Sequence, residues 1–141
     1  MDQSLSFILF FAALLIFAGL LFIVINLTKK GSSQLNVEKY RSDWLNIEQS
    51  LHQNDTASYQ LSVLNADKLL DKALREKGVP GETMGARMKY LQTTWTNAND
   101  VWGAHKVRNQ IAHESNIAIE YGAARRALAA FKQALKDVGA V

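Results

Sequence analysis

The chain has 141 residues, with 16 lysines and arginines, 13 aspartates and glutamates, one proline and no cysteine. The charges are unevenly distributed, because positions 3–28 hold no ionisable side chain but five of the six phenylalanines. This division excludes a wholly soluble protein, a multi-span transporter and a disulfide-stapled scaffold. It predicts a membrane anchor in residues 1–30, a linker in residues 31–36 and a helical domain in residues 37–141.

The anchor is predicted from an unbroken apolar run between Phe7 and Ile25. A helix of that length, at about 1.5 Å per residue, spans roughly 28 Å, which is close to the hydrocarbon thickness of a bilayer. A cleaved signal peptide would have positive charge before a shorter apolar core and a small-residue cleavage site after it. We therefore expect an uncleaved helix that contacts the lipid bilayer through residues 5–28.

The charges that flank this run predict its orientation. Lys29, Lys30, Lys39 and Arg41 follow the run, whereas Asp2 is the only charged side chain before it. The positive-inside rule then places the N-terminus outside and the C-terminal domain in the cytoplasm of a single-pass inner-membrane protein. The absence of cysteine suits a reducing compartment but does not demand one.

Two helices are expected in the first half of the domain. The first has Asn36 as its N-cap, and the second begins near Asp55 and ends at Gly78, two residues before Pro80. Their apolar residues recur at steps of three and four. The side chains expected to face the core are Val37, Tyr40, Trp44, Ile47, Leu51, Leu61, Leu64, Leu69, Leu70, Ala73 and Leu74.

The second half adds three helices. A short helix is expected at 83–91, a longer one capped by Asn97 or Asn99 and running to about His113, and an alanine-rich one near 119–138. The inward side chains expected on the last helix are Ala123, Ala127, Ala130, Phe131, Ala134 and Leu135. Strict period-two alternation occurs nowhere, so the fold class is all-α, with a four- or five-helix bundle after the anchor. Helices this short gain from a partner, and confinement to a membrane favours self-association, so we expect a homodimer.

Familiar catalytic constellations are missing from the sequence. It has no Walker loop, GxGxxG, HExxH or CxxC pattern, and its three histidines have no carboxylate at metal-ligand spacing. We therefore expect no metal and no cofactor. The charge from Lys29 onward is about +4, from 16 basic and 12 acidic residues, which is too mild to indicate a nucleic-acid-binding stripe.

The segment from Trp102 to Glu114 is the richest in chemistry. At 100° per residue, Asn109 and His113 share a helix face, with His105 on the same side. Arg108 is offset from His113 by about 140° and needs its long side chain, or a second protomer, to reach the same site. The segment can therefore present an arginine, an amide and an imidazole to one anionic group.

The sequence from Arg108 to His113 matches the pattern of arginine, polar residue, three variable residues and histidine found in the HEPN superfamily. Residues 37–139 resemble small bacterial members of that superfamily in size, in helical composition and in the motif's place before an alanine-rich last helix. The segment Ala66–Leu70, which contains Asp67, adds to the resemblance.

The resemblance implies a metal-independent endoribonuclease, in which a dimer pairs two motifs at its interface. His113 would then exchange protons with the ribose 2′-hydroxyl and the leaving oxygen, and Arg108 would hold the phosphate. Asn109 would orient one or the other. His105 lies outside the family motif and is not assigned a catalytic role.

Structural interpretations remain open beside this one. Arg108 and Asn109 could bridge helices, and His113 could simply end its helix. The three tryptophans are expected in the core and the Arg125–Arg126 pair on a solvated face. Asp67 is either an acid that lies near Arg108 or an exposed helix charge, and the exposed charge is slightly favoured. The second functional hypothesis is accordingly a noncatalytic adaptor that recruits a protein partner to the membrane.

Overall fold

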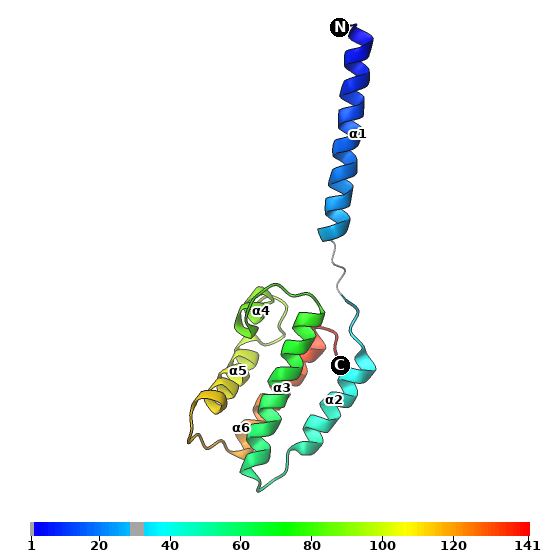
Figure 1. Ribbon diagram of the computed structural model, residues 1–141. Coiled ribbons are helices and arrows are strands. Elements are labelled where there is room, and N and C mark those ends of the chain that lie inside the picture. The colour runs from blue at the N-terminus through cyan, green and yellow to red at the C-terminus, as the bar shows by residue number, and fades with distance from the viewer. Residues whose placement is uncertain (1, 29–32) are drawn as a thin grey trace. The chain divides into compact units, whose positions relative to one another are not determined.

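The computed structural model describes residues 2–28 and 33–141. Within these residues it is all-helical, with six helices and no strand (Figure 1). Contacts divide the chain into two units, Met1–Ser32 and Ser33–Val141, and each is described by itself. The expected linker residues Gly31 and Ser32 lie outside the described residues, and Ser33 to Asn36 form no regular structure.

Helix α1, Gln3–Thr28, makes up the first unit. It contains the predicted run Phe7–Ile25 and extends beyond it at both ends. The large apolar side chains along it are exposed on every side, which is costly in water and favourable in hydrocarbon. The described residues thus include one N-terminal helix that is long and apolar enough to cross a membrane.

The second unit begins with α2, Val37–Ser50, and α3, Thr56–Glu76. The predicted N-cap of α2 is confirmed, because Asn36 Oδ1 accepts the backbone N–H of Lys39 at 3.1 Å. Helix α3 begins where expected, and its N-cap is Asp55, whose Oδ1 accepts the backbone N–H of Ser58 at 3.2 Å. Each bond satisfies a helix-end donor that the helix itself leaves unpaired. Helix α3 ends where expected, because Gly78 has a φ of 76°, in the left-handed region that favours glycine.

Helices α4, Met84–Tyr90, α5, Ala98–His113, and α6, Tyr121–Asp137, complete the unit. Asn97, not Asn99, is the cap of α5, since its Oδ1 accepts the N–H of Asp100 at 3.3 Å. Helix α6 is shorter than the predicted range 119–138. It buries Ala124 and Leu128 together with the expected Ala127, Phe131, Ala134 and Leu135, whereas Ala123 and Ala130 are half-buried.

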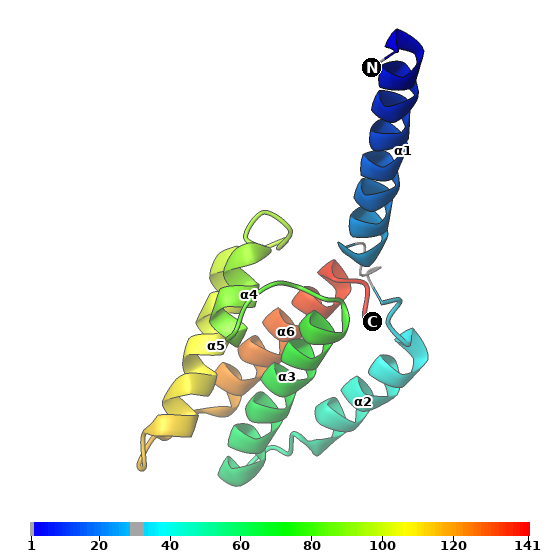
Figure 2. The ribbon, with the colours of Figure 1, turned by 45° about the horizontal axis from the view of Figure 1, so that its top comes forward.

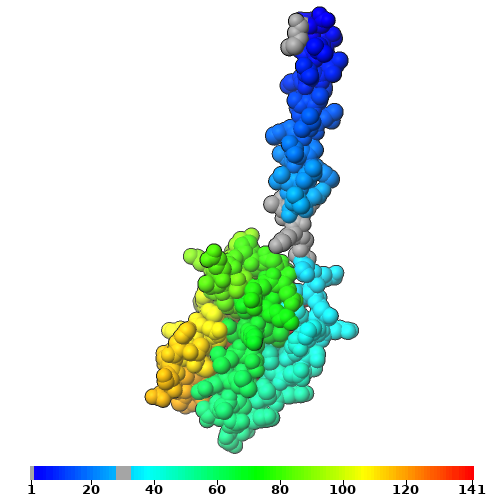
Figure 3. Space-filling model, in the orientation of Figure 1, coloured from blue at the N-terminus to red at the C-terminus, as the bar shows by residue number. Residues whose placement is uncertain are grey.

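Helix α3 is the centre of this unit and contacts α2, α5 and α6 (Figure 2). Its position explains its composition, because a helix covered by three neighbours needs a wide apolar surface. The prediction that Leu61 faces the core is wrong. Leu61 is 54% exposed, because it lies on the part of α3 that these neighbours leave uncovered. In the space-filling view, α3 and α2 form one face of the unit, with the end of α5 at its edge (Figure 3).

Candidate functional site

Helix α5 carries all three residues of the Arg-polar-x3-His pattern. Arg108 and Asn109 lie in its second half and are half-buried, and His113 is its last residue. The helix ends there with Glu114, whose N–H donates to the carbonyl of Gln110 at 2.9 Å. The pattern therefore lies at one end of a rigid helix that packs against both α3 and α6.

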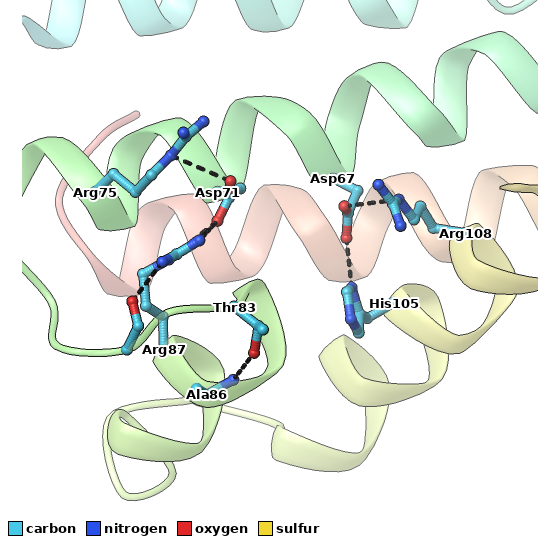
Figure 4. Close-up of polar contacts among 9 residues, drawn as sticks. Asp67, Asp71, Arg75, Thr83, Ala86, Arg87, His105 and Arg108 are labelled. Carbon is cyan, nitrogen blue, oxygen red and sulfur yellow. Dashed lines mark hydrogen bonds and ion pairs between the residues drawn. The ribbon is translucent and has the colours of Figure 1, made fainter.

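Arg108 is paired with a carboxylate on α3. Its Nε lies 3.1 Å from Asp67 Oδ2, and the arginine side chain is 35% exposed (Figure 4). The Nε atom is buried, and its N–H is not aligned for a hydrogen bond with any described residue. The contact is thus chiefly a charge-charge attraction, which the low dielectric of a half-buried position strengthens.

Asn109 contacts the same guanidinium from the other side. Arg108 Nη1 donates to Asn109 Oδ1 at 2.9 Å. The arginine and the polar residue of the motif therefore interact directly, and the amide oxygen limits the directions in which the guanidinium can turn.

His105 completes a buried cluster with Asp67. Its Nδ1 lies 2.7 Å from Asp67 Oδ1, and the two residues are 9% and 2% exposed. The interpretation of Asp67 as an exposed helix charge is therefore wrong. A buried carboxylate needs compensating partners, and Asp67 finds both of them one turn apart on α5.

His113 lies apart from this cluster. Its side chain is exposed, and no hydrogen bond or ion pair joins it to Arg108 within residues 33–141. Five residues along a helix correspond to about 7.5 Å of rise and about 140° of rotation, which agrees with this separation. One copy of the chain thus brings Arg108, Asn109, Asp67 and His105 together but leaves His113 outside the group.

The tryptophans and the arginine pair have the structural positions expected for them. Trp44 and Trp95 are buried, and Trp102 is half-buried, with its ring edge-on to His105 at 6.2 Å between centroids. Arg125 and Arg126 are exposed. Within residues 33–141, no hydrogen bond, ion pair or ring contact joins these side chains to Arg108, Asn109 or His113.

A groove of about 710 Å³ lies between α5 and α6, and neither Asp67 nor His105 lines it. Val107, Ala127 and Ala130 line it, with Asp137 among its polar residues, and the three motif residues do not. Two of its lining residues are joined by hydrogen bonds, because Thr96 donates to Asp137 from its hydroxyl at 2.6 Å and from its backbone N–H at 2.8 Å. The groove and the motif are therefore separate features.

A second polar cluster fixes α4 against α3. Arg87 is buried, and its Nε and Nη2 donate to Asp71 Oδ1 at 3.1 and 2.6 Å, while its Nη1 donates to the carbonyl of Gly81 at 2.7 Å (Figure 4). This arginine ties the loop before α4 to the central helix. All its donor groups face protein acceptors, so the cluster is structural.

The sequence suggested Asp67 as an acid near Arg108 only as the less favoured of two interpretations, and it gave His105 no role in the site. The available signal was the i, i+3 spacing of His105 and Arg108, which places both side chains on one side of α5. The carboxylate they share comes from another helix, and only the packing of α3 on α5 identifies it.

Comparisons of this chain with protein-family models, with curated proteins and with solved structures find no match. The resemblance to HEPN domains therefore stays a prediction from the sequence.

Proposed function

We propose that this chain is a membrane-anchored, HEPN-like endoribonuclease whose Arg108, Asn109 and His113 act on one RNA phosphodiester without a metal. The observation that carries the proposal is the contact of Arg108 Nη1 with Asn109 Oδ1, at 2.9 Å. It makes the first two motif residues one unit at the surface of α5, and His113 is exposed at the end of the same helix.

In the proposed reaction, the ribose 2′-oxygen attacks the phosphorus atom and displaces the 5′-oxygen of the next nucleotide. His113 accepts the proton of the 2′-hydroxyl as that oxygen bonds to phosphorus, and the bond from phosphorus to the 5′-oxygen breaks. A protonated imidazole donates a proton to the leaving 5′-oxygen, which becomes the 5′-hydroxyl of the second product. Arg108 stabilises the charge that develops on the non-bridging oxygens, and the first product ends in a 2′,3′-cyclic phosphate.

A second copy of the chain resolves the separation of Arg108 from His113. Since the two side chains leave α5 in directions about 140° apart, Arg108 of one copy and His113 of another can meet at one phosphate. The proposed active form is therefore a homodimer, which the membrane favours by confining both copies to one plane.

The cleavage test uses the full chain in lipid nanodiscs, a single-stranded oligoribonucleotide and EDTA. Arg108→Ala and His113→Ala should each lower the cleavage rate by about 10² to 10⁴, which is typical for loss of a proton-transfer group or of a charge-stabilising group. His52→Ala, a histidine outside the motif, is the matched control and should cleave like the wild type. Equal rates in all four proteins would overturn the assignment.

The proposed location is the inner membrane, with α1 spanning it and residues 33–141 in the cytoplasm. Because the chain has no cysteine, single cysteines can report which side of the membrane each end occupies. In spheroplasts, Ser4→Cys should react with a membrane-impermeant maleimide, and Thr93→Cys should react only after lysis. The reverse pattern would invert the proposed orientation.

The alternative function is a noncatalytic adaptor that recruits a protein partner to the membrane. The observation that favours it is the ion pair of Arg108 with buried Asp67. The carboxylate already compensates the positive charge of Arg108, which a phosphate would need. An adaptor of this kind retains partner binding after His113→Ala, because that exposed side chain does not support the fold. It also shows no RNA cleavage above that of the double variant Arg108→Ala/His113→Ala.

A further inference from the structure

Both oxygens of the buried Asp67 carboxylate contact side chains of α5. Oδ1 lies 2.7 Å from His105 Nδ1, and Oδ2 lies 3.1 Å from Arg108 Nε (Figure 4). Asp67 itself lies on α3, the central helix of the unit. The position of Arg108 is thus fixed relative to the core and not only relative to its own helix.

The arginine is held on two sides and left open on a third. Nε faces Asp67, Nη1 donates to Asn109, and Nη2 makes no hydrogen bond with any residue in 33–141. Since the side chain is 35% exposed, the unused donors are the part of the guanidinium available to an anion. This is the arrangement of an arginine whose orientation is set before a phosphate binds.

His105 has a role one step further from the phosphate. The imidazole is buried and edge-on to the Trp102 ring at 6.2 Å between centroids, which restricts its rotation. The contact of its Nδ1 with Asp67 Oδ1 restricts the rotation of the carboxylate, whose other oxygen, Oδ2, lies against Arg108. The three side chains form a chain of contacts that runs from the core to the surface.

We propose that Asp67 and His105 are positioning residues that hold the guanidinium of Arg108 in the orientation in which it binds a phosphate of single-stranded RNA. This inference rests on the proposed function and assigns the substrate contact to Nη1 and Nη2 of Arg108. Positioning and simple charge compensation by Asp67 predict opposite changes in RNA affinity when the carboxylate is removed. A carboxylate that only cancels the charge of Arg108 weakens RNA binding, so its removal strengthens binding, whereas a positioning carboxylate does the opposite.

The experiment measures binding of a 2′-O-methyl oligoribonucleotide, which cannot undergo the 2′-hydroxyl reaction, to the full chain in nanodiscs by fluorescence anisotropy. The variants are Asp67→Asn, His105→Gln, Arg108→Ala and the double variant Asp67→Asn/Arg108→Ala. Lys68→Gln, on the neighbouring exposed position of α3, is the matched control. Circular dichroism of each variant verifies that the helices are retained.

Positioning predicts that Asp67→Asn and His105→Gln each weaken binding by about tenfold, in the direction of Arg108→Ala, because misplacing a binding group loses its interaction. It also predicts that Asp67→Asn has no further effect once Arg108 is alanine. A general structural role would instead lower binding equally in both backgrounds.

Unchanged or tighter binding by Asp67→Asn, together with weaker binding by Arg108→Ala, would overturn this inference and leave the proposed function intact. Absence of both binding and cleavage in the wild type would overturn the proposed function and the inference with it. If Asp67→Asn loses its helical signal, His105→Gln decides the question, because it leaves the carboxylate and its charge in place.

Discussion

Asp67 Oδ2 lies 3.1 Å from Arg108 Nε, so the motif arginine of α5 is paired with a carboxylate that is almost completely buried on α3. The other oxygen of the same carboxylate, Oδ1, lies 2.7 Å from His105 Nδ1. This shared carboxylate joins the fold to the candidate site, because it packs two helices together and fixes the side chain proposed to bind the substrate.

Removal of this carboxylate should destabilise the domain. Asp67→Ala leaves His105 and Arg108 without their shared partner, and loss of one member of a buried ionic group costs about 3 kcal/mol of unfolding free energy. Urea unfolding of the full chain in detergent micelles, followed by tryptophan fluorescence, measures the change. Lys68→Gln, at an exposed position, should change the free energy by less than about 0.5 kcal/mol. Equal stability of Asp67→Ala and the wild type would contradict the buried pairing.

The buried guanidinium of Arg87 gives a second stability prediction. Arg87→Ala removes its bonds to Asp71 and to the carbonyl of Gly81 and should cost about 3 kcal/mol. Arg87→Lys should recover only part of this loss, because one ammonium group cannot reproduce a planar fork with donors on both sides. The same unfolding measurement tests the order, in which lysine lies between arginine and alanine. A lysine variant as unstable as the alanine variant would show that the charge contributes nothing.

Acid stability should depend on Glu48. The hydrogen bond from Lys132, at 2.8 Å, outweighs partial burial and lowers the pKa of Glu48 below its ordinary value of 4.5. A lowered pKa gives stability that is present above the unfolded pKa and lost as the pH falls through the folded one. Glu48→Gln should therefore be less stable than the wild type at neutral pH and lose less stability between about pH 5 and about pH 3.

Thermal unfolding at several pH values tests this expectation. Glu82→Gln is its control, because Glu82 is exposed and makes no ion pair within residues 33–141. If Glu48→Gln and the wild type lose stability in parallel as the pH falls, the pairing with Lys132 does not contribute.

Much of the fold could be predicted from the sequence because its helix ends carry local signals. Asn36, Asp55 and Gly78 act through their own neighbours in the chain, so their roles need no knowledge of the tertiary structure. Helical periodicity located the segments between them in the same way. Leu61 shows the limit, since an apolar residue on a helix is buried only where another helix covers it.

The candidate site was less predictable for the same reason. Arg108, Asn109 and His113 are recognisable because they form a short pattern on one helix. Asp67 precedes Arg108 by 41 positions, and a lone carboxylate in a helical pattern is normally solvated. Its burial follows from the packing of α3 on α5, which periodicity does not specify.

A site shared between two copies predicts complementation between inactive variants. In a mixed dimer of Arg108→Ala with His113→Ala, one of the two composite sites contains both intact residues, so about half of the wild-type activity per dimer should return. Coexpressed chains with two different affinity tags allow the mixed dimer to be isolated and assayed. A site formed within one copy gives no recovery, because each chain then lacks one of the two groups.

The proposed function requires that Arg108 and His113 together cleave RNA by attack of the 2′-hydroxyl. Its most direct test is mass spectrometry of the ends that the full chain in nanodiscs produces from a single-stranded oligoribonucleotide in EDTA. The wild type should give fragments with 2′,3′-cyclic phosphate and 5′-hydroxyl ends, and Arg108→Ala/His113→Ala should give none. Intact oligoribonucleotide after incubation with the wild type, or the same fragments from the double variant, would contradict it.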